Sequence, residues 1–123
     1  MNEKRILIVD DEESFTRLLR MTLEGTGKFV VEEVNDGRQA LEAARQFKPD
    51  IVFLDVVMPE IDGGDVATQL RADPELAALP IVFLTAIVSP KEAGNETDIG
   101  GFPFLAKPVS VEAIVKAVEA HCE

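Results

Sequence analysis

Four polar side chains in this sequence each come directly after a short apolar run. They are Asp10, Asp55, Thr85 and Lys107. Runs of this kind are typical of buried strands in a parallel sheet, and the carboxyl ends of such strands meet at one edge. Ligands bind at that edge, at the point where the strand order reverses. We therefore expect the four side chains to converge on one crevice, with Asp10 and Asp55 on either side of the reversal.

Asp10, its neighbour Asp11 and Asp55 would bring three carboxylates together in that crevice. Carboxylates so close together raise one another's pKa unless a positive group compensates their charge. Carboxylate oxygens, a backbone carbonyl and waters suit Mg²⁺, or Mn²⁺ in its place, and such a metal shares its shell readily with a phosphate. Lys107 supplies a second positive charge. The sequence therefore predicts a metal site beside a lysine.

A carboxylate between a metal ion and an ammonium group can attack a phosphoryl donor, because phosphoryl transfer needs mainly positioning and charge stabilisation. Asp55 is the predicted nucleophile. The Thr85 hydroxyl can donate a hydrogen bond to the new phosphoryl group, a contact that exists only in the modified protein. Taken singly, Asp11 could be a helix N-cap, Thr85 a strand former and Lys107 solvated surface. Their joint placement favours the site.

Five short apolar runs alternate with segments of helical period, which predicts an α/β fold: a three-layer, doubly wound, five-stranded parallel sheet. The runs are Arg5 to Val9, Phe29 to Val34, Ile51 to Leu54, Ile81 to Leu84 and Phe102 to Ala106. Purely apolar runs belong in the centre of such a sheet. Glu32, Glu33 and Pro103 mark the second and fifth runs as edge strands. The expected strand order is 2-1-3-4-5, which is flavodoxin-like.

The helical segments should pack apolar stripes on the sheet. The stripe of the first helix consists of Phe15, Leu18, Leu19 and Leu23. Ser110 is the expected N-cap of the last helix. Between Ser89 and Gly101 the chain is rich in glycine and contains an asparagine, and both residues oppose helix formation. We expect an irregular or short fourth helix there.

Length and composition predict one domain over residues 1–123, with no effector domain in this chain and no membrane span. The apolar run near the amino terminus is too short for a signal peptide, so we expect a cytoplasmic protein. The formal net charge of -11 argues against direct binding to nucleic acid. Cys122 and His121 stand alone and predict neither a disulfide nor a zinc site.

The sequence strongly resembles the receiver domain of two-component response regulators, the chemotaxis type (CheY-like), over essentially its whole length. The motifs that carry the resemblance are Ile6 to Glu12, Asp55 to Pro59, Asp62-Gly63, Leu84-Thr85-Ala86 and Lys107-Pro108. The resemblance implies that Asp55 accepts phosphate from a phosphohistidine of a sensor histidine kinase or a histidine phosphotransfer protein. It also implies that Asp10, Asp11 and the Val57 backbone carbonyl hold Mg²⁺. Such a module is a signalling switch with an unknown protein target, and it assists only its own phosphorylation and dephosphorylation.

Further expectations follow from the same resemblance. The Lys107-Pro108 bond is expected to be cis, and Phe104 occupies the position of the aromatic that turns inward when Thr85 moves to the phosphate. Permanent packing of Phe104 inside the protein is an equally good interpretation. Val57 and Ile87 are apolar where polar residues in some relatives orient attacking water, so we expect slow self-dephosphorylation.

Other classes of protein fit less well. Phosphatases with a nucleophilic aspartate carry a second aspartate two residues later, whereas Asp55 is followed by Val56-Val57. No glycine-rich phosphate loop follows the first strand, which excludes a nucleotide-binding domain. A docking module that never takes phosphate, and the amino-terminal receiver of a longer regulator, both stay open. The resemblance to receiver domains also implies that the kinase is recognised through the first helix, so Arg17 and Arg20 are candidates for this contact by their position alone.

Overall fold

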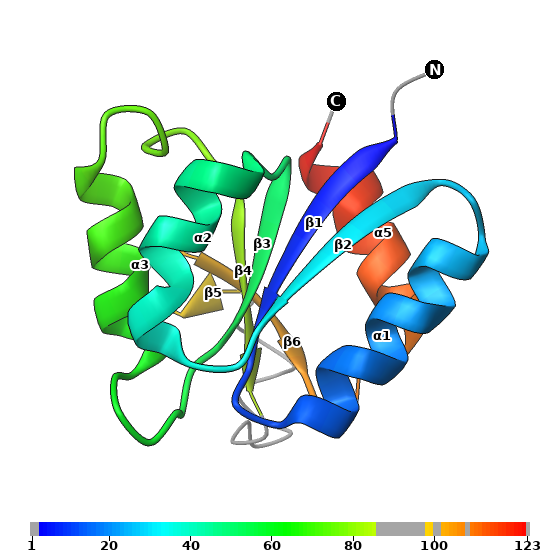
Figure 1. The fold of residues 1–123 in the computed structure, drawn as a ribbon, viewed down its shortest axis with the longest axis horizontal. Coiled ribbons are helices and arrows are strands. Elements are labelled where there is room, and N and C mark those ends of the chain that lie inside the picture. Colours follow the sequence, from blue (N-terminus) through cyan, green and yellow to red (C-terminus); the bar gives the residue numbers. More distant parts are fainter. Residues whose placement is uncertain (1–2, 86–97, 100–101, 108, 123) are drawn as a thin grey trace.

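The computed structural model describes residues 3–85, 98–99, 102–107 and 109–122. Strands and helices alternate along these residues (Figure 1). The strands are β1 (Lys4–Val9), β2 (Phe29–Val34), β3 (Ile51–Asp55), β4 (Ile81–Thr85), β5 (Asp98–Ile99) and β6 (Phe102–Ala106). The helices are α1 (Glu13–Gly25), α2 (Ala40–Phe47), α3 (Gly63–Ala72) and α5 (Val111–His121), and a single 3₁₀ turn, Gly37–Gln39, precedes α2.

The sheet has the order β2-β1-β3-β4-β6-β5. Strands β2, β1, β3, β4 and β6 are all parallel, which confirms the predicted doubly wound fold and its order 2-1-3-4-5. The prediction that the fifth run is an edge strand is wrong, because the two-residue β5 pairs antiparallel with Phe102 and Pro103. Strand β5 itself lies within the segment from Ser89 to Gly101 that was predicted to hold an irregular or short helix. The rest of that segment lies outside the described residues.

Alternate side chains of the central strands enter two separate cores. Ile6 and Ile8 of β1 pack with residues of α1 and α5, whereas Leu7 and Val9 pack with residues of α2 and α3. Figure 1 shows the two helix pairs on opposite faces of the sheet, which confirms the three-layer prediction. All four side chains are fully buried. Burial of one such side chain stabilises the fold by about 1.5–3 kcal/mol.

Helix α1 buries a narrower stripe than the sequence predicted. Leu19 and Leu23, one turn apart, are buried, but Leu18 is 64% exposed. Leu18 lies one residue, or about 100°, round the helix from Leu19, and this rotation turns it away from the sheet. No helix among the described residues combines the length and apolarity that a membrane crossing would need.

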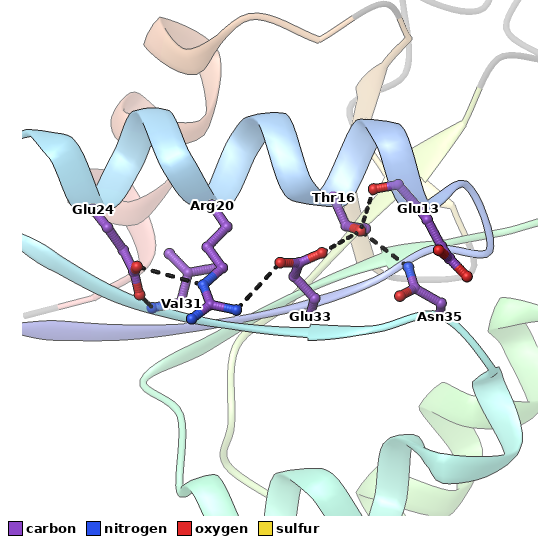
Figure 2. Close-up of polar contacts among 7 residues, drawn as sticks. All are labelled: Glu13, Thr16, Arg20, Glu24, Val31, Glu33 and Asn35. Atoms are coloured by element: carbon purple, nitrogen blue, oxygen red, sulfur yellow. Dashed lines mark hydrogen bonds and ion pairs between the residues drawn. The ribbon is translucent and has the colours of Figure 1, made fainter.

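Polar side chains of α1 form hydrogen bonds and ion pairs with the edge strand β2, as Figure 2 shows. Thr16 Oγ1 donates to Glu33 Oε1 at 2.9 Å, and Arg20 Nη1 lies 3.4 Å from Glu33 Oε2. One turn further along, Glu24 Oε2 accepts a hydrogen bond from the backbone N–H of Val31 at 3.0 Å. The acidic residue Glu33, which marked β2 as an edge strand, therefore also fixes β2 to α1.

Candidate functional site

The predicted acidic cluster forms at the carboxyl ends of β1 and β3. These strands are neighbours in register, with Val9 opposite Leu54, so that Asp10 and Asp55 follow on adjacent strands. Asp10, Asp11 and Asp55 each place one carboxylate oxygen within 4.8 Å of the others. Asp10 is fully buried and Asp55 is 6% exposed, while Asp11 is exposed to solvent. The structure thus brings together the three carboxylates that the sequence singled out.

Hydrogen bonds hold the loop that carries Asp10. Its Oδ1 accepts from the backbone N–H of Glu12 at 2.9 Å, at the start of α1. Glu12 is the N-cap position, so Asp11 is not the cap that one interpretation of the sequence allowed. The Asp10 carbonyl accepts from Asn35 Nδ2 at 2.8 Å. Asn35 Nδ2 also donates to Thr16 Oγ1 at 3.0 Å, as Figure 2 shows. Asn35 was not among the predicted site residues, although an asparagine directly after a strand was a usable signal.

Lys107 reaches the acidic cluster from the loop after β6. Its backbone N–H donates to the Thr85 carbonyl at 2.8 Å, which continues the pairing of β6 with β4. Its Nζ lies 2.6 Å from Asp10 Oδ2 and 3.6 Å from Asp55 Oδ1. The first contact is a close ion pair with a carboxylate that is fully buried. With 18% of its side chain exposed, Lys107 is largely removed from water.

Burial and neighbouring charge raise the pKa of Asp55 to about 6. Loss of hydration is the larger cause, the charge of Asp10 adds to it, and the charge of Lys107 opposes both. For Lys107, burial acts to lower the pKa, but close contact with Asp10 and the charges of Asp10 and Asp55 outweigh it and raise the pKa above its ordinary value. Lys107 is therefore a permanent cation in this site, and its charge offsets only part of the rise in the pKa of Asp55.

An aromatic ring lies beside the same lysine. Lys107 Nζ is 4.9 Å from the centroid of the Phe15 ring. Phe15 is half-buried in the first turn of α1 and packs against the core shared by α1 and α5. Phe15 was predicted only as part of the apolar stripe of the first helix, and its contact with Lys107 was not expected.

The segment after Asp55 packs closely against it. The backbone N–H of Gly63 donates to the Val56 carbonyl at 2.7 Å, and Asp62 caps α3 by accepting from the N–H of Asp65 at 2.9 Å. A side chain at position 63 would run into the Asp55 carbonyl oxygen. Val57 has its side chain 58% exposed, and its N–H lies 3.4 Å from Asp55 Oδ1.

The two predicted switch residues lie on the next strands of the sheet. Thr85 is buried at the end of β4, one residue beyond Leu84, the register partner of Asp55. Phe104 pairs with Phe83 and is half-buried against the core under α2 and α3, so its role in switching stays a prediction. The predictions for Ala86, Ile87 and Pro108, including the cis peptide, lie outside the described residues.

The donor set fits a small, hard divalent cation. Three carboxylate oxygens lie within 4.8 Å of one another, and one of the contributing residues is fully buried. Oxygen donors in small number are the ligands that Mg²⁺ prefers, since it keeps several waters. A second positive charge beside Lys107 would also relieve the repulsion that contributes to the raised pKa of Asp55.

Comparisons with known proteins agree with this geometry. Residues 6–119 match the family described as "Response regulator receiver domain". The chain is 40% identical over 123 residues to the "Alkaline phosphatase synthesis transcriptional regulatory protein PhoP" of Bacillus subtilis. It is 38% identical over 118 residues to the "DNA-binding response regulator MtrA" of Mycobacterium tuberculosis. These alignments cover 98% and 96% of this chain but 50% of either relative, so the chain spans about half the length of the curated relatives it matches.

Solved structures give the same result. Chemotaxis protein CheY4 of Vibrio cholerae superposes with a TM-score of 0.83 at 29% identity, covering 98% of this chain and 99% of that one. The signal receiver domain of a signal transduction histidine kinase from Syntrophus aciditrophicus has a TM-score of 0.77 at 31% identity, covering 95% and 88%. With the fold, the acidic cluster and these matches in agreement, the chain belongs to the response regulator receiver domain family, the phosphoacceptor modules of two-component systems.

Proposed function

We propose that Asp55 accepts a phosphoryl group, with Mg²⁺ present, from a phosphohistidine of a sensor histidine kinase or a histidine phosphotransfer protein. One observation carries the proposal: the buried Asp55 carboxylate lies 3.6 Å from Lys107 Nζ and within 4.8 Å of the carboxylates of Asp10 and Asp11. This arrangement gives a nucleophile that lies close both to a cation and to a donor set for a second cation.

In the proposed transfer, an Asp55 carboxylate oxygen attacks phosphorus while the phosphorus–nitrogen bond of the donor breaks, giving an acyl phosphate and a free imidazole. With a pKa of about 6, Asp55 is ionised at neutral pH and can attack. Asp10, Asp11 and the Val57 backbone carbonyl would hold Mg²⁺, which when bound neutralises charge on the phosphoryl oxygens. Lys107 contributes its ammonium to the same oxygens from the opposite loop.

In the proposed switch, the Thr85 hydroxyl donates a hydrogen bond to the new phosphoryl group, and Phe104 turns inward as Thr85 moves. The position of Thr85 beside the strand of Asp55 supports the first step. Phe104 on the neighbouring strand β6 is half-buried and packs against the core under α2 and α3, so an inward turn would bury more of its ring. The outcome is a change in protein–protein contacts, so the role is signalling, with no catalytic activity beyond the domain's own phosphorylation and dephosphorylation.

The context of this domain is part of the proposal. Two relatives of about twice its length are named as a transcriptional regulatory protein and a DNA-binding response regulator, which favours an amino-terminal receiver of a longer regulator over a stand-alone one. The net charge of -11 supports output through a protein partner, without direct contact between this domain and nucleic acid. We propose that it acts in the cytoplasm, where its donor would meet it.

Intact-protein mass spectrometry after incubation with acetyl phosphate tests the function. We expect a phosphoryl adduct with Mg²⁺, none with chelator and none in Asp55→Asn. Asp65→Asn is the matched control, because Asp65 is an exposed aspartate on α3 outside the three-carboxylate group. If small donors give no adduct, a phosphohistidine donor is tried next. Failure of both donors with the wild-type protein would establish a docking module that takes no phosphate.

A further inference from the structure

We propose that Phe15 is a positioning residue of the phosphorylation site, whose ring face holds the Lys107 ammonium against the carboxylates of Asp10 and Asp55. The inference rests on the proposed function and deepens it, because it adds a residue to the machinery that places the positive charge.

The geometry is that of a cation–π contact. Lys107 Nζ lies 4.9 Å from the centroid of the Phe15 ring, inside the limit of about 6 Å at which the negative face of a ring attracts a cation. The same nitrogen lies 2.6 Å from Asp10 Oδ2 and 3.6 Å from Asp55 Oδ1. The ammonium thus has an aromatic partner as well as two carboxylate partners. The attraction to the ring is strong here because only 18% of the Lys107 side chain is exposed to competing water.

Phe15 is held more rigidly than Lys107, so in this contact the ring positions the lysine. Phe15 lies in the first turn of α1, one turn before the buried Leu19, and packs on the core that includes Leu23 and Ile114. Lys107 has a flexible four-carbon side chain on a loop after β6. A ring fixed by the core can therefore restrict the lysine, whereas the lysine has little influence on the ring.

Packing alone does not require an aromatic residue at position 15. A leucine or methionine there would also contribute apolar volume to the core of α1 and α5, but neither has a ring face to attract an ammonium. The matched set of variants is therefore Phe15→Leu and Phe15→Met, which remove the ring, against Phe15→Tyr, which keeps it. Phe29→Leu is the control for loss of a ring from the same core, because Phe29 lies at the start of β2, at the opposite end of the sheet.

The first readout is independent of phosphorylation. In the metal-free protein, the ε-methylene protons of Lys107 should be shifted upfield by the current of the Phe15 ring, as seen in a proton–carbon NMR spectrum and assigned with Lys107→Met. We expect Phe15→Leu and Phe15→Met to abolish the upfield shift. Phe15→Tyr and Phe29→Leu should retain it.

The second readout is the rate of phosphorylation by acetyl phosphate at saturating Mg²⁺. We expect Phe15→Leu and Phe15→Met to slow it by about threefold to tenfold, the range of a partly desolvated cation–π contact. Phe15→Tyr should restore the rate, and Phe29→Leu should leave it within about twofold of wild type.

The two readouts separate the two proposals. Wild-type protein that takes no phosphoryl group from any donor contradicts the proposed function, and the NMR shift still decides whether the ring holds the lysine. Wild-type phosphorylation with an unchanged rate in the folded Leu or Met variant overturns the role of Phe15. The same conclusion follows if Phe15→Tyr is as slow as Phe15→Leu, or if the Lys107 shift survives removal of the ring.

Discussion

Lys107 Nζ lies closer to Asp10 than to Asp55, at 2.6 Å from an oxygen of the first and 3.6 Å from an oxygen of the second. In the unmodified domain the lysine therefore neutralises mainly the carboxylate that is fully buried. Asp55, which is buried almost as deeply, keeps a pKa raised to about 6. The phosphoacceptor is thus ionised at neutral pH at some cost to the stability of the fold.

The first prediction is that Asp55→Asn stabilises the metal-free protein at neutral pH. The pKa of Asp55 is about 6 in the folded state against an ordinary value of 3.8, so the wild type loses stability as the pH rises from 3.8 to about 6. Asparagine does not ionise, so the Asp55→Asn protein keeps the folding stability that the wild type loses over this pH range. After allowance for solvent screening, we expect a gain of about 1–2 kcal/mol at pH 7.5 that shrinks as the pH falls and vanishes only below the ordinary pKa of 3.8. Urea unfolding in chelator measures it, and parallel pH curves for the two proteins would contradict it.

The same substitution at Asp73 should have the opposite sign. Arg45 Nε lies 2.6 Å from Asp73 Oδ2, and this hydrogen bond holds the pKa of Asp73 below its ordinary value. A lowered pKa contributes stability that is present above the ordinary pKa and is lost as the pH falls through the folded-state value. Asp73→Asn should therefore lower the free energy of unfolding at pH 7.5, and its curve should approach that of the wild type in acid. A stabilised Asp73→Asn protein would refute this account.

Gly63→Ala should destabilise the domain by about 1–3 kcal/mol, because a Cβ at position 63 has no space. It would press on the Asp55 carbonyl oxygen and lie 2.9 Å from the Val56 Cα, both backbone atoms. Gly25→Ala is the matched control, since a Cβ there meets nothing within 4 Å. Thermal unfolding of both variants checks the prediction. Equal melting temperatures would contradict it, because they would show that the backbone at Asp55 and Val56 can shift to make room for the new Cβ at little cost.

Asn35→Ala should loosen the loop that carries the acidic cluster. It removes the donor to the Asp10 carbonyl and a donor to Thr16 Oγ1, for an expected loss of about 1–2 kcal/mol. Calorimetric titration should also show weaker Mg²⁺ binding. Thr16→Ser keeps the hydroxyl that Asn35 and Glu33 contact and should leave Mg²⁺ binding unchanged. If the Asn35→Ala protein bound Mg²⁺ as tightly as the wild type, Asn35 would have no part in positioning the acidic cluster.

Val57→Asn should shorten the lifetime of the phosphorylated protein. The Val57 side chain is 58% exposed beside Asp55 and offers no group to orient a water. An asparagine amide could hold that water for attack on the acyl phosphate. The decay of the phosphorylated mass after removal of the donor measures the effect, with Val57→Leu as the apolar control. An unchanged decay in Val57→Asn would reject the prediction of slow self-dephosphorylation through this residue.

The five parallel strands and the three-carboxylate cluster could be predicted because both depend on local pattern. Continuous apolar runs identify buried parallel strands, and a polar residue after each run then falls at one edge. The contact of Phe15 with Lys107 could not be predicted, since it joins residues far apart in sequence whose side chains meet only once the sheet has formed and α1 has packed on it. The exposure of Leu18 and the short β5 depend in the same way on which neighbours cover each surface.

The hydrogen bond from Val31 to Glu24 has a consequence for self-association. Strand β2 ends the sheet, and the unpaired N–H groups of an edge strand can pair with an extended segment of another molecule. The Glu24 carboxylate occupies one of these donors at 3.0 Å and places a negative charge where an incoming strand would need to lie. In a concentrated solution, the charged end of α1 thus protects the open edge of the sheet from growth into fibrils by strand addition.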